Sequence, residues 1–435
     1  MSPGPTFLTL SARDPLIARD GRPFELGLRM KSLDWFYPSV VAGSLRTMLG
    51  NLASGFPAAA DEYSRVTDAL KQIAIGGPFP CVNGEIYFPG PQDVVFREKD
   101  GVLDAFGMRP VGLKARGDGG GSDLPPGLEP ALLPRNIEED FKAVKSPAFW
   151  SCAEIIRWIL NASGRDFFPK STTTWPASFL HAPAKDVRTH VQMDPETGAG
   201  KSGALFQSIG LDLFQFIRGD GHGTPGISKD ALSIRVVSEG EHGDRLRGLD
   251  RLHPLGGERR LVRWEAGNEP AGWTCPDEVR RHLQAIEDRP RKRVRMVLAT
   301  PALFRMGWRP GWLHEQAEGG RIRLTGTVPG TDVIVRLISA CIDRWRPISG
   351  WSYERGSVGA KPIRRLVPAG GVYFFEVMDG KPGQLAARWL ESVCDESILG
   401  DHQYIGDGAQ NRRDGFGLAL WGVWEPADPA STFDT

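Results

Sequence analysis

Glycine and proline limit how this chain can fold: 53 glycines and 34 prolines make up one fifth of its 435 residues. Both residues interrupt regular helices and strands, so long uninterrupted elements are excluded over most of the sequence. The share still lies below the roughly 25–30% that is typical of low-complexity chains, and 40% of the residues are hydrophobic. With about 150 residues per domain as a guide, we expect a folded, loop-rich protein of two or three domains.

The N-terminal segment and the cysteines indicate a cytoplasmic protein. The first fifteen residues, MSPGPTFLTLSARDP, contain no basic region followed by an apolar one, as a secretion signal would. No apolar run approaches the roughly 18 residues that a membrane span requires, so we expect no membrane contact. Five cysteines are scattered singly and form no C-x-x-C pair, which predicts reduced, buried thiols: Cys81, Cys152, Cys275, Cys341 and Cys394.

Periodic apolar residues predict an α+β chain. Short apolar runs predict strands, and apolar residues at 3.6-residue spacing predict helices. The predicted strands are Thr6–Leu10, Ala204–Ile217, Val294–Thr300, Thr331–Ile338, Val372–Val377 and Gly415–Trp424, and the predicted helices begin at Pro38, Pro147 and Pro382. This order resembles half of a β-α-β-β-α-β ferredoxin-like unit, so the chain can hold two such units, one at each end. A loop at Gly117–Pro130 marks an insertion.

Two glycine patterns suggest phosphate binding, and neither is complete. Pro195–Ser202 ends in the Gly-Lys-Ser of a P-loop, but Pro195 stands where the motif needs its first glycine. We interpret this segment as the polar tip of a hairpin. Gly221–Gly226 matches G-x-G-x-x-G, but Pro225 and Gly226 disfavour the helix that would receive a pyrophosphate. We interpret that match as chance.

No pattern in the sequence predicts catalysis. The eight histidines include no pair at i and i+4, and there is no G-x-S-x-G motif. We therefore predict no metal, no cofactor and no catalytic residue.

Arginine is unevenly used although 53 basic and 53 acidic residues balance. The chain has 40 arginines against 13 lysines, and Arg245–Arg309 contains fifteen basic and eight acidic residues. Five cations fall within Arg289–Arg295 alone. Arginine binds phosphates with two parallel hydrogen bonds and stacks on bases. GC-rich coding could explain the total, but the local excess favours contact with nucleic acid.

The segment Gly406–Gly417 carries two pairs of glycines around a polar, basic stretch and leads into an apolar strand. Glycines allow the backbone to approach a ligand closely, and Arg412 and Arg413 supply cations for phosphates. The alternative is an ordinary solvated hairpin loop.

Taken in order, these segments resemble the third subunit of the type III-B (Cmr) CRISPR effector complex, a family within the RAMP superfamily. The resemblance runs from residue 7 to about residue 424 and is weakest near 100–185. It rests on Asp14–Phe24, Pro38–Arg46, His190–Phe206, Leu255–Arg260, Thr300–Trp308, Ile348–Trp351, Val367–Phe375 and Gly406–Gly417.

The resemblance implies two ferredoxin-like (RRM-like) domains with loop and helical insertions. Residues 1–240 would form the first, with an insertion near 100–185 and a thumb-like hairpin near 188–206. Residues 241–435 would form the second. It also implies a non-catalytic, RNA-binding subunit in antiviral defence that caps the complex and holds the 5′ handle of the CRISPR RNA. Its implied partners are that RNA, a backbone RAMP subunit and the large polymerase-like subunit.

The family's motifs give the candidate RNA-binding residues. They are Arg19, Arg22, Arg46, Lys201, Gly257, Arg259, Arg260, Gly406, Gly408, Arg412, Arg413, Gly415 and Gly417. The terminal segment has six residues between its glycine pairs where the superfamily usually has five, so the side chains that face RNA stay open. Gly371 stands where the family more often has serine. Some RAMP proteins process repeat RNA with a histidine base, so His190 and His402 keep a RAMP-type endoribonuclease as the alternative.

Overall fold

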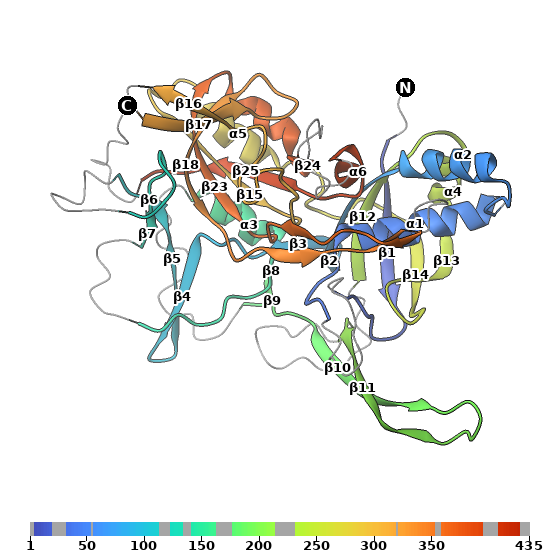
Figure 1. Ribbon diagram of the computed structural model, residues 1–435. Coiled ribbons are helices and arrows are strands. Elements are labelled where there is room, and N and C mark those ends of the chain that lie inside the picture. The colour runs from blue at the N-terminus through green and yellow to red at the C-terminus, as the bar shows by residue number, and fades with distance from the viewer. Residues whose placement is uncertain are drawn as a thin grey trace.

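The computed structural model describes residues 4–19, 32–53, 55–112, 122–133, 141–161, 176–213, 231–318, 321–352, 358–394 and 408–426. Within these ranges the chain is a strand-rich mixture of helices and antiparallel sheets (Figure 1). This confirms the predicted mixture of helices and strands. Four predictions lie outside the described residues: Arg22, Gly406, His402 and the segment Gly221–Gly226.

The first sheet has eight strands, and every neighbouring pair is antiparallel. Its order is β13 (Asp250–Pro254), β14 (Leu261–Gly267), β1 (Thr6–Ala12), β12 (Ala231–Val237), β2 (Ala74–Val82), β3 (Glu85–Pro89), β8 (Phe149–Ser151) and β9 (Phe179–Leu180). Helix α1 (Pro38–Ala53) packs on β2 and β13, α2 (Ala60–Lys71) packs on α1, and α4 (Gly240–Arg247) packs on β1. The apolar side of α1 is buried, as its spacing predicts: Val41, Leu45, Met48 and Leu49.

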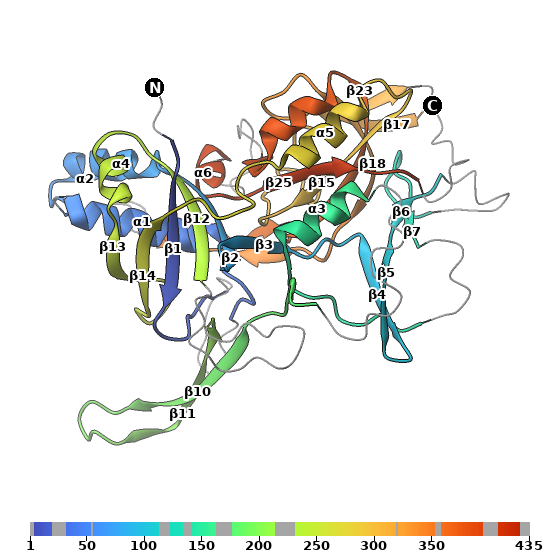
Figure 2. The ribbon, with the colours of Figure 1, turned by 180° about the vertical axis from the view of Figure 1, so that it is seen from behind.

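The second sheet has seven antiparallel strands from the C-terminal part of the chain. Its order is β16 (His314–Glu318), β17 (Arg321–Thr327), β18 (Ile334–Cys341), β23 (Val372–Asp379), β15 (Lys292–Leu298), β25 (Leu418–Val423) and β24 (Glu391–Ser392). Helices α3 (Cys152–Leu160) and α5 (Asp277–Ala285) cross one face and pack on β25 (Figure 2). The 3-10 helix η2 (Pro382–Arg388) packs on α5.

In the described part of the chain, five antiparallel ribbons lie outside the two sheets. They pair β4 (Val94–Lys99) with β5 (Val102–Gly107), β6 (Arg109–Pro110) with β7 (Ala131–Leu132), β10 (Ala184–Met193) with β11 (Gly200–Asp212), β19 (Arg346–Ile348) with β22 (Arg364–Leu366), and β20 (Trp351–Ser352) with β21 (Gly359–Ala360). The β10–β11 hairpin projects away from both sheets (Figures 1 and 2). Its tip is polar, which confirms that reading of Pro195–Ser202.

Three predicted elements differ from the structure for local reasons. The helix expected from Pro147 begins at Cys152, because Phe149–Ser151 pairs with β3 and β9, and Ser151 caps the helix by accepting from the Glu154 amide at 3.3 Å. The helix expected from Pro382 is a short 3-10 helix, because Leu390 has a positive φ and the next residues pair with β25. The terminal segment predicted as a loop contains α6 (Gly408–Arg413).

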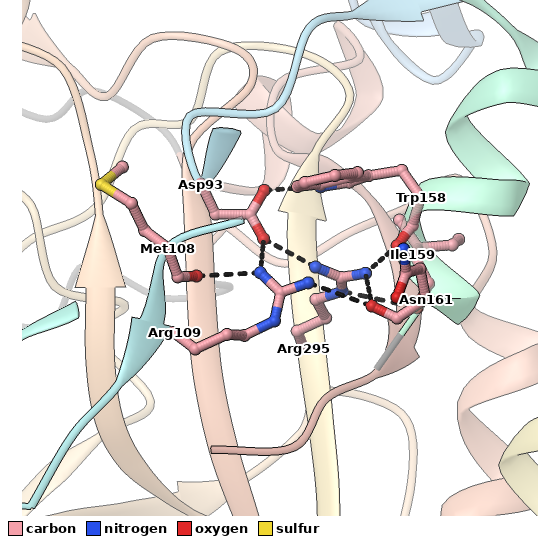
Figure 3. A network of polar contacts seen from close by, with 7 residues as sticks. All are labelled: Asp93, Met108, Arg109, Trp158, Ile159, Asn161 and Arg295. Carbon is pink, nitrogen blue, oxygen red and sulfur yellow. Dashed lines mark hydrogen bonds and ion pairs between the residues drawn. The ribbon is translucent and has the colours of Figure 1, made fainter. Parts of the chain in front are cut away.

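A fully buried ion cluster ties the two halves of the chain together (Figure 3). The Asp93 carboxylate accepts from Arg109 at 2.9 Å, from Arg295 at 2.6 Å and from the Trp158 indole at 2.7 Å. Arg109 begins β6, Arg295 lies on the interior strand β15, and Trp158 lies on α3. The cluster therefore joins the region after β3, helix α3 and the second sheet.

Among the described residues, the cluster brings together two cations, Arg109 and Arg295, and the Asp93 carboxylate. Both cations also meet the C-terminal end of α3, where Arg109 donates to the Asn161 carbonyl at 3.0 Å and Arg295 donates to the Trp158 carbonyl. Helix C-termini carry partial negative charge, which favours cations there. Burial, and then the neighbouring charge of Arg109, lowers the pKa of Arg295 to about 9. Keeping Arg295 charged in the core therefore costs desolvation free energy.

All five cysteines are free and buried, which confirms the predicted thiols. Burial raises the pKa of Cys152 to about 12 and that of Cys275 to about 11. Among the described helices, none has the length and apolar character that would be needed to cross a membrane.

Candidate nucleic-acid interface

Helix α1 contacts the chain beside two groups of predicted RNA-binding residues. Ser44 donates its hydroxyl to the Pro254 carbonyl at 2.6 Å, directly before the turn Gly256–Arg260. Two residues later, Arg46 donates to the Asp414 carboxylate at 2.5 Å, in the turn that follows α6. The stretch of α1 that carried the family resemblance therefore lies between a turn of the first sheet and the C-terminal segment.

The first group surrounds the N-terminal segment 14–19. Leu16 exchanges backbone hydrogen bonds with Leu211 at 2.9 and 2.7 Å, at the base of the β10–β11 hairpin. The next residue, Ile17, accepts from the Gly257 amide at 2.7 Å. Arg19 follows with an exposed side chain. The structure thus brings Arg19, the hairpin base and the Gly257 turn together.

Backbone geometry explains the glycines of this turn. Gly256 has a φ of +78°, and a Cβ there would lie 2.2 Å from the Ile17 carbonyl oxygen. Glu258 and Arg259 also have positive φ, 55° and 50°, so the turn is tight and the Arg259 side chain is exposed. Arg260 is paired with Glu258 at 2.9 Å. Within the described residues Arg259 has no ion pair, which makes it the available cation of this turn.

The second group centres on α6 and the start of β25. Gly415 has a φ of +94°, and a Cβ would lie 2.5 Å from the Ile75 carbonyl oxygen of β2. A Cβ at Gly417 would lie 2.5 Å from the Cys394 sulfur. Both glycines are buried, and their amides already donate, to the Arg412 and Pro301 carbonyls respectively. In this structure the two glycines therefore let the chain pack closely on itself, and their contact with RNA stays a prediction.

The cations of α6 remain at the surface of this group. Arg412 and Arg413 occupy the last turn of the helix, where positive charge is favoured, and both are half-buried. Arg413 forms no ion pair with any residue that the structure describes. Gly408 is buried at the first position of the helix.

Arg46 supports this group from α1. Besides Asp414, it donates to the Ile73 carbonyl at 2.8 Å, and its side chain is only 12% exposed. We assign Arg46 to positioning the turn after α6, and its direct contact with RNA stays a prediction. The sequence analysis missed Asp414 as its partner. The signal was an acidic residue directly after two arginines in an otherwise basic segment.

The basic segment Arg245–Arg309 does not form one surface. Its residues are spread over the edge of the first sheet, α5 and the centre of the second sheet, and Arg295 is fully buried. Several of its arginines are paired with acids of the same chain: Arg245–Glu241, Arg247–Asp244, Arg263–Asp250, Arg280–Asp277, Arg289–Glu425 and Arg309–Glu315. The basic residues of this segment therefore do not form one cationic surface, and contact of its individual arginines with RNA stays a prediction.

The β10–β11 hairpin presents exposed side chains over its projecting part. Five apolar ones are 42–71% exposed: Val187, Val191, Met193, Leu205 and Phe206. Lys201 is exposed near the tip. The tip is closed by Asp194, whose carboxylate accepts from the amides of residues 196 and 197 at 2.9 and 3.1 Å. Those hydrogen bonds lower the pKa of Asp194. A projecting, amphipathic hairpin of this kind is suited to contact a partner.

His190 lies in the middle of the hairpin. Its Nε2 lies 2.8 Å from the Ser208 hydroxyl, and its ring stacks on Phe206 with 5.2 Å between ring centroids. These contacts fix the imidazole against a hydroxyl and an aromatic ring, whereas acid–base cleavage of RNA requires a second proton-transfer group. Among the described residues, no cluster of His, Cys, Asp and Glu could hold a metal ion.

Comparison with known proteins gives a family for these features. A family model described as CRISPR-associated protein (Cas_Cmr3) matches residues 8–424. No curated protein sequence matches the chain. Among solved structures, a chain of a type III-B Cmr-β complex bound to cognate target RNA is 13% identical, with a TM-score of 0.45 and coverage of 95% of this chain and 96% of that chain. A chain of a Csm3–Csm4 subcomplex from a type III-A interference complex is 7% identical, with a TM-score of 0.34 and coverage of 97% and 100%.

The assignment rests on the family model, since identities and TM-scores this low carry no weight of their own. The matched range includes every segment on which the predicted resemblance rests, from Asp14–Phe24 to Gly406–Gly417. It also includes the α1 residues that join the two groups. The chain belongs to the Cas_Cmr3 family, the RAMP-like subunits of type III-B CRISPR effector complexes.

Proposed function

We propose that this chain is a non-catalytic RNA-binding subunit that caps its effector complex and holds the 5′ handle of the CRISPR RNA. The observation that carries the proposal is the meeting of distant family segments at α1: Ser44 contacts the end of β13 before the Gly256–Arg260 turn, and Arg46 contacts the turn after α6. In this proposal a backbone RAMP subunit and the large polymerase-like subunit are its protein neighbours.

We further propose that the two sheets are two ferredoxin-like units. In such a unit the four strands lie in the order fourth, first, third, second. The orders β14-β1-β12-β2 and β25-β15-β23-β18 support this arrangement in both halves. The expected boundary at 240/241 precedes β13 and β14, which pair within the first sheet, so we place it after Gly267.

The chemistry of the two groups suits backbone recognition of single-stranded RNA. Arg259 and Arg413 offer guanidinium groups for phosphates, and the hairpin offers an aromatic ring, Phe206, that is 43% exposed. RNA readers commonly combine phosphate contacts with bases splayed onto aromatic side chains. Phosphate contacts release counterions, so affinity should fall steeply with salt.

The variant Arg412→Ala/Arg413→Ala should bind handle-bearing RNA more weakly and with a shallower salt dependence. If both side chains contact phosphates, the slope of log K against log salt should flatten by about 1.4, since each contact contributes roughly 0.7 on a single strand. The measurement is fluorescence anisotropy of a labelled handle RNA over a series of salt concentrations.

The matched control is Arg280→Ala/Arg281→Ala, another adjacent arginine pair, which lies exposed on α5. It should leave both affinity and slope unchanged. An Arg412→Ala/Arg413→Ala protein with wild-type affinity and slope would remove α6 from the RNA-binding surface.

A further inference from the structure

A second aromatic and basic surface lies on the ribbon formed by residues 344–352 and 358–366, which we call the tryptophan ribbon. Its two halves are held together by β19–β22 pairing, with Ile348 opposite Arg364, and by β20–β21 pairing, with Trp351 opposite Ala360. Ile348 and Leu366 are each 1% exposed, so one side of the ribbon is anchored in the core. Its conformation therefore does not depend on the side chains that face solvent.

The solvent side carries tryptophans. Trp345 is 47% exposed and Trp351 is 57% exposed, and they are the only exposed tryptophans in the described part of the chain. Ile363 and Val358 add further exposed apolar surface. Large exposed aromatic side chains usually mark a binding site, because their burial is among the most favourable contacts a surface can make.

Positive charge surrounds these tryptophans. The described ribbon carries five cations and, beside it, the single acid Asp343, which pairs with Arg346 at 3.7 Å. The cations are Arg344, Arg346, Lys361, Arg364 and Arg365. The Arg365 guanidinium lies 4.8 Å from the centre of the Trp345 ring, so a cation and a stacking surface are held side by side.

The ribbon adjoins the second group of the candidate interface. Arg364 donates to the Asn411 side chain on α6 at 3.0 Å. Tyr37, the residue before α1, donates its hydroxyl to the Pro347 carbonyl of the ribbon at 3.2 Å. An RNA strand at α6 would therefore find the ribbon directly beside it.

We propose that the tryptophan ribbon is a further contact for single-stranded RNA, in which bases stack on Trp345 and Trp351 and neighbouring arginines pair with the phosphates. The combination of aromatic rings and cations is that of proteins that bind single strands without sequence preference, and the contact of Arg364 with α6 places it beside the candidate interface. The inference rests on the proposed function. It adds aromatic rings on which bases can stack to an interface whose predicted RNA-binding residues are cations and glycines.

The test is the affinity of the full chain for a labelled single-stranded oligouridine of about 16 nucleotides, measured by anisotropy. Trp345→Ala/Trp351→Ala should weaken binding roughly 100-fold, at about tenfold for each stacked base. Trp345→Phe/Trp351→Phe should retain most of the affinity, because phenylalanine still stacks. A control pair of exposed apolar residues on other strands, Leu252→Ala/Ile322→Ala, should bind as wild type does. The melting temperature of every variant reports whether it is folded.

Three outcomes would overturn the inference. If the alanine variant binds RNA as the wild type does while Arg412→Ala/Arg413→Ala binds weakly, the ribbon has no part in RNA binding and the proposed function stands. If the alanine variant binds RNA normally but no longer co-purifies with its neighbouring subunits, the ribbon is a protein-docking surface. If the wild-type chain itself binds no RNA, the proposed function fails together with the inference.

Discussion

Replacing Asp93 by asparagine should lower the free energy of unfolding by about 3–5 kcal/mol, the usual cost of removing one partner of a buried ion pair. Among the residues that the structure describes, Asp93 is the carboxylate that the fully buried Arg109 and Arg295 share. Without its charge, both cations would lose the carboxylate that they share in the core. Urea denaturation followed by tryptophan fluorescence measures the effect as a lower midpoint.

The control for Asp93 is Asp104→Asn. Asp104 also binds an arginine, Arg97, at 2.6 Å, but both side chains are partly exposed, so the loss should be within about 1 kcal/mol. Adding Arg295→Met to Asp93→Asn should restore part of the stability, since it removes the cation left without a carboxylate. A midpoint for Asp93→Asn equal to that of Asp104→Asn would contradict the role assigned to the cluster.

Gly256→Ala should cost roughly 2–4 kcal/mol of stability and should also weaken RNA binding. The alanine must adopt a positive φ, and its Cβ would lie 2.2 Å from the Ile17 carbonyl oxygen, so segment 14–19 has to move. That segment accepts from Gly257 and carries Arg19 beside the hairpin base. The measurements are the urea midpoint and the affinity for handle RNA.

Gly101→Ala separates the cost of a positive φ from the cost of the clash with Ile17. Gly101 has nearly the same φ, +76°, at the tip of the β4–β5 hairpin, and nothing lies within 4 Å of its Cβ position. It should cost only about 1 kcal/mol, the price of the left-handed conformation, and leave RNA binding intact. Equal losses in the two variants would show that the contact with Ile17 does not matter.

Local patterns in the sequence predict the elements that are amphipathic on their own. The prediction of helix α1 is correct because Val41, Leu45 and Leu49 fall on one side of a helix. The helix expected from Pro147 starts late because Trp150 and its neighbours pair with distant strands, a contact between residues far apart in sequence that periodicity does not report.

For the candidate site, too, local sequence patterns predicted some residues, and contacts between distant residues could not be predicted. The family segments named the turn at Gly257 and the cations of α6, but not their common contact with α1, which depends on folding. Charge counting pointed to Arg289–Arg295, where the structure buries Arg295 against Asp93, a residue 202 positions earlier. Exposure is also invisible in the sequence, so Trp345 and Trp351 could not be told from the core tryptophans Trp150 and Trp421.

The central claim is that this chain holds the 5′ handle of a CRISPR RNA. The most direct test is to purify the tagged chain from its own cells after ultraviolet crosslinking and to sequence the RNA attached to it. The account predicts crosslinks at the repeat-derived 5′ end of the CRISPR RNA, on peptides that include Arg259, Phe206 or α6. Crosslinks confined to the 3′ end of the guide, or none in an otherwise intact complex, would contradict it.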